Sequence, residues 1–231
     1  MGEAEEIAAR VAAIRERIAE ACVRAGRDPA AVTLVAASKL QPAERLRAAW
    51  DAGVRVFGEN RVQEAAAKRP LLPDAEWHLL GPLQSNKVRA AAELFGTFHA
   101  LDRPKILEAV AAEAGRRGGE AAGFVEVNLG GESSKHGFAP RDLPAALAPY
   151  RALSGLRLVG LMAIPPPGAD AEASRPWFRR LRALRDELAA APGWEGFSGW
   201  LSMGMSDDFA VAVEEGATHV RVGTALFGPR R

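Results

Sequence analysis

The chain has 231 residues, of which 48% are hydrophobic, enough for one full-sized core, and we expect residues 1–231 to form a single domain. Acidic and basic residues nearly cancel to a net charge of +1, which argues against a nucleic-acid or membrane surface built on bulk charge. The single cysteine, Cys22, excludes an internal disulfide. The use of a single cysteine and the lack of a signal peptide at the start of the sequence favour a reducing, cytoplasmic location.

The first predicted element is an amphipathic helix over residues 5–26. Apolar side chains recur at helical spacing from Ile7 to Ile18, with Glu and Arg between them, and Gly26 is a natural stop. We expect this N-terminal segment, residues 1–27, to pack on the rest of the domain.

Short strand-like runs and helical segments alternate through the remainder of the chain. Strands are predicted at residues 33–38, 54–58, 76–81, 97–101, 124–128, 157–163, 200–202 and 219–223, and helices at 42–52, 60–68, 86–94, 103–117, 140–153, 171–190 and 207–215. This alternation predicts an α/β fold, a (β/α)8 TIM barrel with an extra N-terminal helix. An open doubly wound sheet is the competing interpretation. It would show fewer strands, and its glycine-rich turn after the first strand is missing here.

A single lysine, Lys39, ends the first predicted strand. Lysine is almost never buried without a reason, so a lysine at the exit of a core strand needs an explanation. One interpretation is an ε-amine held in a partly desolvated pocket, where it acts as a Schiff-base nucleophile. The alternative is a lysine that merely extends from the strand end into solvent.

Polar and small residues follow the seventh and eighth predicted strands. Ser202, Gly204, Gly223 and Thr224 are suited to a phosphate site, because hydroxyls donate hydrogen bonds and glycines let the backbone approach an anion. The alternative is that these residues only turn tight corners. Together with Lys39 they favour a phosphate-bearing carbonyl compound, and pyridoxal 5′-phosphate (PLP) supplies both groups. A sugar phosphate that forms a Schiff base with Lys39 is the other candidate ligand.

Six segments also resemble one family. They are VAASKL (35–40), VFGEN (56–60), WHLLGPLQSNK (77–87), GLMAIP (160–165), LSMGMSDD (201–208) and RVGTALFG (221–228). In this order they resemble the pyridoxal-phosphate homeostasis proteins, which are PLP-binding barrels related to the N-terminal domain of alanine racemase. The resemblance covers nearly all of the chain beyond the opening helix.

The resemblance implies a set of cofactor-binding residues. It implies that Lys39 carries PLP as an aldimine, that Ser202, Gly223 and Thr224 hold the phosphate, and that Arg221 approaches the pyridine nitrogen. It also suggests that Asn60 lines the same mouth. An arginine stays protonated and cannot take a proton from the ring nitrogen, so the cofactor there would be a weak electron sink.

The resemblance further implies a protein without catalytic turnover. A racemase of this fold needs a second acid or base, a tyrosine from a C-terminal β-domain in alanine racemase. This sequence ends at Arg231, soon after the eighth predicted strand, and its one tyrosine, Tyr150, falls on a predicted outer helix. We therefore expect an intracellular PLP homeostasis protein that shields the cofactor and delivers it to apo PLP-dependent enzymes. The alternative is a minimal PLP-dependent racemase or lyase that uses Lys39 with His78 or Lys135.

Other residues have ordinary interpretations. Lys135 is either a second amine that captures PLP in transit or a solvated loop lysine. The four histidines show no metal-ligand spacing, so a structural or hydrogen-bonding role is expected. The arginines of residues 171–190 indicate a solvated basic face or a surface for a client enzyme. With no β-domain to build a shared site, we expect a monomer.

Overall fold

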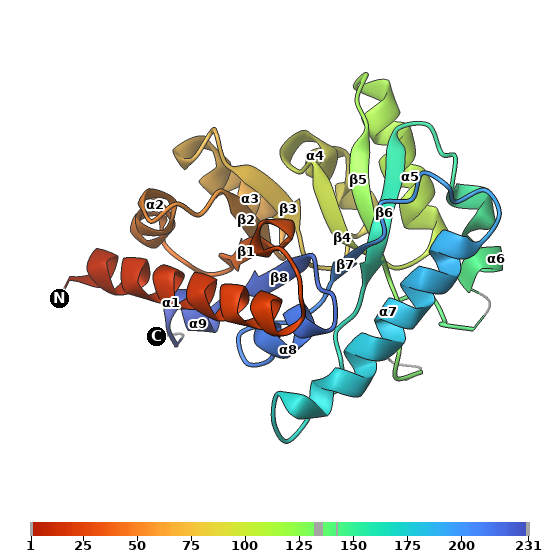
Figure 1. Ribbon diagram of the computed structural model, residues 1–231. Helices are drawn as coiled ribbons and strands as arrows, with labels where there is room; N and C mark the ends of the chain where they lie inside the picture. Colours follow the sequence, from red (N-terminus) through yellow and green to blue (C-terminus); the bar gives the residue numbers. More distant parts are fainter. Residues whose placement is uncertain (1, 132–135, 142, 230–231) are drawn as a thin grey trace.

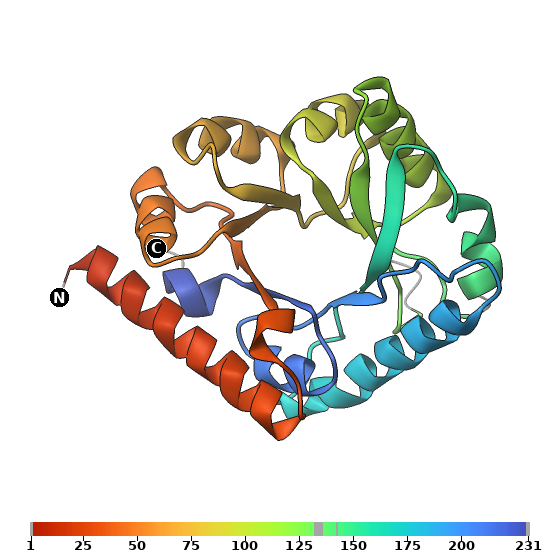
Figure 2. The same cartoon turned by 45° about the horizontal axis from the view of Figure 1, so that its top comes forward.

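A closed barrel of parallel strands forms the centre of the protein. The computed structural model describes residues 2–131, 136–141 and 143–229. Each strand pairs with the next along the chain, and the last pairs with the first, so no sheet edge is left open (Figure 2). The strands are β1 (Thr33–Ala37), β2 (Val56–Glu59), β3 (Glu76–Leu79), β4 (Thr97–Leu101), β5 (Ala121–Glu126), β6 (Leu156–Met162), β7 (Trp200–Ser202) and β8 (His219–Val222). The predicted TIM barrel is confirmed.

A ring of helices covers the outside of the barrel (Figures 1 and 2). They are α1 (Glu3–Arg24), α2 (Ala43–Asp51), α3 (Val62–Lys68), α4 (Val88–Leu94), α5 (Pro104–Arg116), α6 (Leu143–Leu147), α7 (Arg175–Ala190), α8 (Phe209–Glu214) and α9 (Thr224–Phe227). Within the described ranges, none of these helices is both long enough and apolar enough to cross a bilayer.

Most elements differ from their predicted extents by a few residues, and two of these differences have a clear physical cause. β5 begins at Ala121, three residues before the predicted start, because its first residues pair with β6 although alanine has little strand propensity. The predicted helix 140–153 is reduced to α6 and a 3₁₀ turn, Ala148–Tyr150, with a proline in each. A proline removes a backbone donor and clashes with the preceding turn, which shortens a helix.

The opening helix α1 buries one apolar face against the outer helices of the barrel. Its buried residues follow the predicted spacing and are Ile7, Val11, Ile14, Ile18, Ala21 and Cys22. The helix contacts α2, α8 and α9, so it covers the seam where β8 meets β1 (Figure 1). Burial raises the pKa of the Cys22 thiol, which keeps it in the unreactive protonated form.

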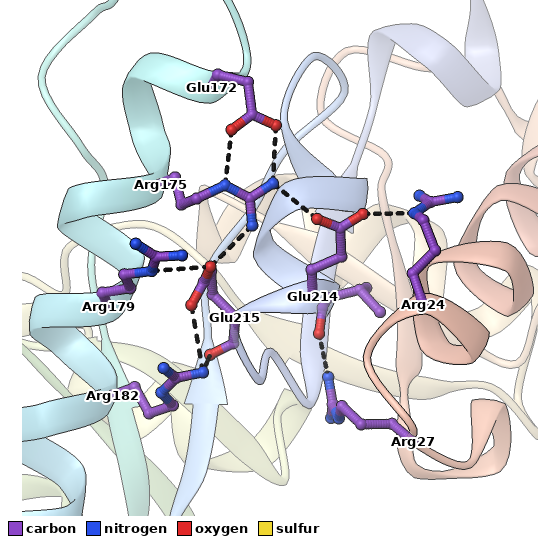
Figure 3. A network of polar contacts seen from close by, with 9 residues as sticks. Arg24, Arg27, Glu172, Arg175, Arg179, Arg182, Glu214 and Glu215 are labelled. Carbon is purple, nitrogen blue, oxygen red and sulfur yellow. Dashed lines mark hydrogen bonds and ion pairs between the residues drawn. The ribbon is translucent and has the colours of Figure 1, made fainter.

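The arginines of α7 are engaged in contacts within the molecule. Arg175, Arg179 and Arg182 all form ion pairs with Glu215, at the end of α8, and Arg175 also pairs with Glu172 and Glu214 (Figure 3). Glu214 in turn pairs with Arg24 of α1. The predicted solvated basic face does not describe Arg175, whose side chain is 21% exposed, whereas Arg179 and Arg182 remain 62% and 40% exposed while they join α7 to α8.

Aromatic and histidine rings fill part of the barrel interior. His78, His99 and His219 come from β3, β4 and β8, and their ring centroids lie 5.0–6.1 Å apart. Phe124 of β5 stacks 4.5 Å from His99, and Trp200 of β7 lies 5.1 Å from His219. These rings contact one another although their strands are not all neighbours in the barrel, so the side chains must point into its interior.

Candidate functional site

The predicted cofactor-binding residues follow four neighbouring strands. Because β7, β8, β1 and β2 are adjacent in the closed barrel, their carboxyl ends form one sector of its mouth. Ala37 of β1 aligns with Gly58 of β2, and Ala36 aligns with Val222 of β8, so the residues just beyond them meet. The fold thereby brings together the strand ends that carry Lys39, Asn60, Ser202, Arg221, Gly223 and Thr224.

Lys39 lies in a tight, half-buried turn directly after β1. The next residue, Leu40, has a φ of 60°, a left-handed conformation that is costly for a side chain of this size, and it is 65% exposed. Two backbone contacts fix the turn: the Ser38 N–H donates to the Gly58 carbonyl at 2.9 Å, and the Leu40 N–H donates to Glu64 Oε2 at 2.9 Å. A strained backbone conformation that is held in place by neighbouring contacts is characteristic of functional sites.

A buried ion pair supports this turn from the side of β2. Lys68 Nζ donates to the Ser38 carbonyl and to Glu59 Oε1, each at 2.7 Å, and the Ser38 hydroxyl also donates to Glu59 Oε1 at 2.7 Å. Burial raises the pKa of the Glu59 carboxyl, and the hydrogen bonds from Lys68 and Ser38 partly offset that rise. The sequence analysis missed this pair, because no local spacing shows that Lys68 at the end of α3 reaches back to the end of β2.

The loops after β7 and β8 meet at the start of α9. Ser206 Oγ accepts a hydrogen bond from the Ala225 N–H at 3.0 Å, which leaves its own proton free to donate to a ligand. A Cβ at Gly223 would lie 3.2 Å from the Ala37 carbonyl oxygen, so a glycine lets β8 pass close to the end of β1. Gly204, with a φ of 90°, is needed where the β7 loop turns tightly against Phe209.

Arg221 is a buried arginine inside the mouth. Its Nη1 donates to Ser202 Oγ at 2.5 Å and its Nη2 donates to the Ala163 carbonyl at 3.2 Å. Burial lowers the pKa of Arg221 to about 10, so the guanidinium remains charged at pH 7. Among the described residues it has no carboxylate within ion-pair distance, which leaves a buried cation at the strand ends.

Ser202 differs from the other predicted phosphate ligands. Its side chain is fully buried, and its hydroxyl lies 2.7 Å from His99 Nδ1 in addition to its contact with Arg221. The hydroxyl is therefore directed toward the barrel interior. Ser206 is the hydroxyl of this loop that reaches the start of α9, and the sequence analysis did not select it although it belongs to the same SMGMS segment.

Asn60 lines a cavity of about 890 Å³ between the loops that follow β2, β3 and β4. Its lining includes Arg61, Lys87, Arg103 and Glu64. Glu64 also accepts from the Leu40 N–H, so the wall of this cavity adjoins the turn that carries Lys39.

The other acid–base candidates do not gather at the mouth. Both ring nitrogens of His78 are engaged inside the barrel, Nε2 with Glu76 at 2.7 Å and Nδ1 with His99 at 2.9 Å. Tyr150 lies in the outer layer of the fold. Lys135 lies outside the described residues. Within those residues, no three histidine, cysteine or acidic side chains are arranged to hold a metal ion.

Comparison with known proteins identifies the family. A model described as the alanine racemase N-terminal domain matches residues 5–231. The chain belongs to the alanine racemase N-terminal domain family. Within that family it is 47% identical to the pyridoxal phosphate homeostasis protein of Pseudomonas aeruginosa, over 97% of this chain and 96% of that one. The protein of the same name from Escherichia coli is 38% identical over 97% of each chain. The resemblance to pyridoxal-phosphate homeostasis proteins is confirmed.

Solved structures of similar proteins share the barrel. PipY of Synechococcus elongatus, solved with PLP bound, superposes with a TM-score of 0.84 at 41% identity and covers 96% of this chain and 100% of its own. Alanine racemase of Clostridium difficile superposes with a TM-score of 0.72 at 14% identity. That likeness shows the fold alone, and this chain covers 55% of the racemase chain.

Proposed function

We propose that this protein binds PLP through Lys39 and serves PLP homeostasis without catalytic turnover, as a cytoplasmic monomer that passes the cofactor to apo PLP-dependent enzymes. The single observation that carries the proposal is the structure of PipY with PLP bound, at 41% identity over nearly the whole chain. The relatives named pyridoxal phosphate homeostasis protein, which match over almost their full length, support the physiological role. They also favour PLP over a sugar phosphate.

The residues at the mouth fit this cofactor. The Lys39 amine would form a Schiff base with the aldehyde, which is the chemistry that PLP supplies when bound. The Ser206 hydroxyl, Gly223 and Thr224 lie where two loops converge and suit a phosphate. Arg221 supplies a charged donor beside them, and Ser202 acts on the cofactor by holding Arg221 in place. Asn60 and the cavity that it lines would border the same mouth.

The same geometry disfavours a racemase or lyase. Such an enzyme needs a second acid or base that reaches the substrate carbon. His78 is buried, with both ring nitrogens hydrogen-bonded to other side chains, so it does not supply that group. Arg221 cannot accept the ring-nitrogen proton, and a cofactor held this way stabilises a carbanion poorly.

The test combines absorbance spectroscopy with borohydride reduction and peptide mapping of the purified protein. We expect a yellow protein, and after reduction a pyridoxyl group on the peptide that contains Lys39. Lys39→Ala should abolish the modification, whereas Lys105→Ala, at an exposed position on α5, should leave it unchanged. A protein that takes up no added PLP, or one that exchanges the Cα proton of amino acids with solvent deuterium at enzyme-like rates, would contradict the proposal.

A further inference from the structure

A continuous line of hydrogen-bonded side chains runs through the barrel interior. From the mouth inward, Arg221 Nη1 lies 2.5 Å from Ser202 Oγ, which lies 2.7 Å from His99 Nδ1. His99 Nε2 lies 2.9 Å from His78 Nδ1, and His78 Nε2 lies 2.7 Å from Glu76 Oε1. We call these five residues the interior chain. It begins at Arg221, near the carboxyl end of β8, and ends at Glu76, the first residue of β3, whose side chain is 59% exposed.

The two ends of the interior chain fix the direction of every hydrogen bond within it. Arg221 can only donate, and an ionised Glu76 can only accept. The hydrogen bond from His78 lowers the pKa of Glu76, which keeps this carboxyl ionised at pH 7. Burial holds the pKa of His99 well below its ordinary value of 6.5, so His99 is neutral.

When each imidazole carries a single proton, one assignment satisfies all four hydrogen bonds. His78 donates from Nε2 to Glu76 and accepts at Nδ1 from His99 Nε2–H. His99 accepts at Nδ1 from the Ser202 hydroxyl, which in turn accepts from Arg221. The opposite direction would need a second proton on His78, because its Nε2–H already donates to Glu76 and its Nδ1 would also have to donate.

The other titratable groups near the chain do not take part in it. His219 packs against His78 and His99, but its Nδ1 contacts Thr218 Oγ1, and burial lowers its pKa to about 3. Asp208 and Glu126 act on Arg221 only through longer-range attraction. Among the described residues, Ser202 is therefore the side chain that orients the guanidinium, and its own direction depends on His99, His78 and Glu76.

We propose that Glu76, His78 and His99 are positioning residues: by fixing the Ser202 hydroxyl as an acceptor, they hold the guanidinium of Arg221 in the orientation that faces the pyridine nitrogen of PLP. The role toward PLP rests on the proposed function. The direction of the hydrogen bonds does not, so the two can fail separately.

The first experiment measures histidine tautomers in the full-length protein without cofactor. Long-range ¹H–¹⁵N correlation spectra of ¹⁵N-histidine-labelled protein at pH 7 should show His78 and His99 as neutral Nε2–H tautomers. An Nδ1–H tautomer at His99, or a doubly protonated His78, would overturn the assignment. Glu76→Gln, at the exposed end, keeps an acceptor oxygen but can also donate. We expect it to add a second tautomer at His99, and an unchanged spectrum would count against the proposal.

The second experiment follows the guanidinium of Arg221. In ¹⁵N-arginine spectra of the cofactor-free protein, a held guanidinium gives separate Nη signals because rotation is slow. We expect His78→Phe to merge them, since the phenyl ring keeps the packing but cuts the interior chain. His219→Phe is the matched control, because it removes an imidazole from the same cluster without touching the chain. Equal behaviour of the two variants would overturn the positioning role.

The third experiment uses the PLP-bound protein. When Arg221 is held less firmly, its positive charge repels a proton on the cofactor less strongly. His78→Phe should therefore raise the pH at the midpoint of the pH-dependent absorbance change. We expect about a threefold gain in proton affinity, or half a pH unit. His219→Phe should leave the midpoint in place. If the Arg221 signals merge but the midpoint does not shift, the interior chain positions Arg221 but does not influence the cofactor, and that part of the proposal would be wrong.

Discussion

Lys68 holds the Lys39 turn with charge as well as with hydrogen bonds. It contacts the Ser38 carbonyl and the Glu59 carboxylate, and the Glu59 side chain is fully buried. Glu59 Oε2 has no hydrogen-bond partner among the residues that the structure describes. Within the described part of the chain, Lys68 is the ion-pair partner of this carboxylate, and the same amine also holds the backbone that carries Lys39.

Replacing Lys68 with methionine should destabilise the protein and weaken PLP binding. Removing one partner of a buried ion pair leaves an uncompensated charge, and we expect a loss of about 3 kcal/mol in the free energy of unfolding. Urea denaturation measures the loss, and a PLP titration measures the weaker binding. Lys105→Met, on the exposed surface of α5, should change neither quantity. A Lys68→Met protein as stable as the wild type would show that the pair contributes no net stability.

Residues at strand ends were predictable from sequence, whereas residues that reach the site from elsewhere were not. Lys39 and Arg221 stand out because each is a cation in or directly after an apolar strand. Lys68 is the last of the seven residues of α3, and its contact with Glu59 depends on how that helix is rotated against the barrel. Ser202 was predicted as a phosphate ligand, but no sequence pattern reveals that its hydroxyl is already bonded to His99.

At the scale of elements, Glu215 joins α7 to the end of α8. Its side chain is 5% exposed and forms ion pairs with Arg175 at 2.8 Å, Arg179 at 3.1 Å and Arg182 at 3.2 Å (Figure 3). Glu214, beside it, links the same arginine network to Arg24 of α1. Three outer helices are thereby tied together on the flank where the chain leaves α8 and returns to the barrel at β8.

Glu215→Gln should lower the free energy of unfolding by about 2 kcal/mol, because the arginine side chains lose a buried charge but remain partly solvated. Chemical denaturation measures this loss. Glu187→Gln is the matched control, because Glu187 is an exposed glutamate of α7. A loss of similar size in both variants would contradict a specific role for Glu215.

The order and type of the main elements followed from the hydrophobic pattern, but their extents depended on partners. The pattern placed β4 and β7 at their observed bounds. It missed α9, a four-residue helix too short to show a period, and it overextended α6 across its prolines. Local propensity identifies an element, and pairing or packing decides where it stops.

At the scale of the whole molecule, the buried histidines make stability depend on pH. The pKa of His219 falls from 6.5 to about 3 because burial disfavours its charged form, and that of His99 is also lowered. Between these values the unfolded chain binds protons that the folded barrel excludes. This stabilisation is complete above pH 6.5 and is lost as the pH falls toward 3.

We therefore expect the free energy of unfolding to decrease from pH 6.5 downward. His219→Gln should reduce the slope by up to about 1.4 kcal/mol per pH unit in this range. Denaturation curves at several pH values measure it. His136→Gln is the control, because the His136 side chain is 67% exposed. A slope that does not change in His219→Gln would show that His219 is protonated in the folded protein.

The pairing of β1 with β8 also constrains when the barrel can form. β1 is the first strand to leave the ribosome and β8 the last that the structure describes, so one edge of β1 stays unpaired during most of synthesis. An open parallel edge is prone to pair with other chains. α1 packs against α8 and α9 as well as α2, so part of its apolar face also stays uncovered until these last helices emerge. Closure of the barrel is thus a late step, and the nascent chain is most exposed to aggregation just before it.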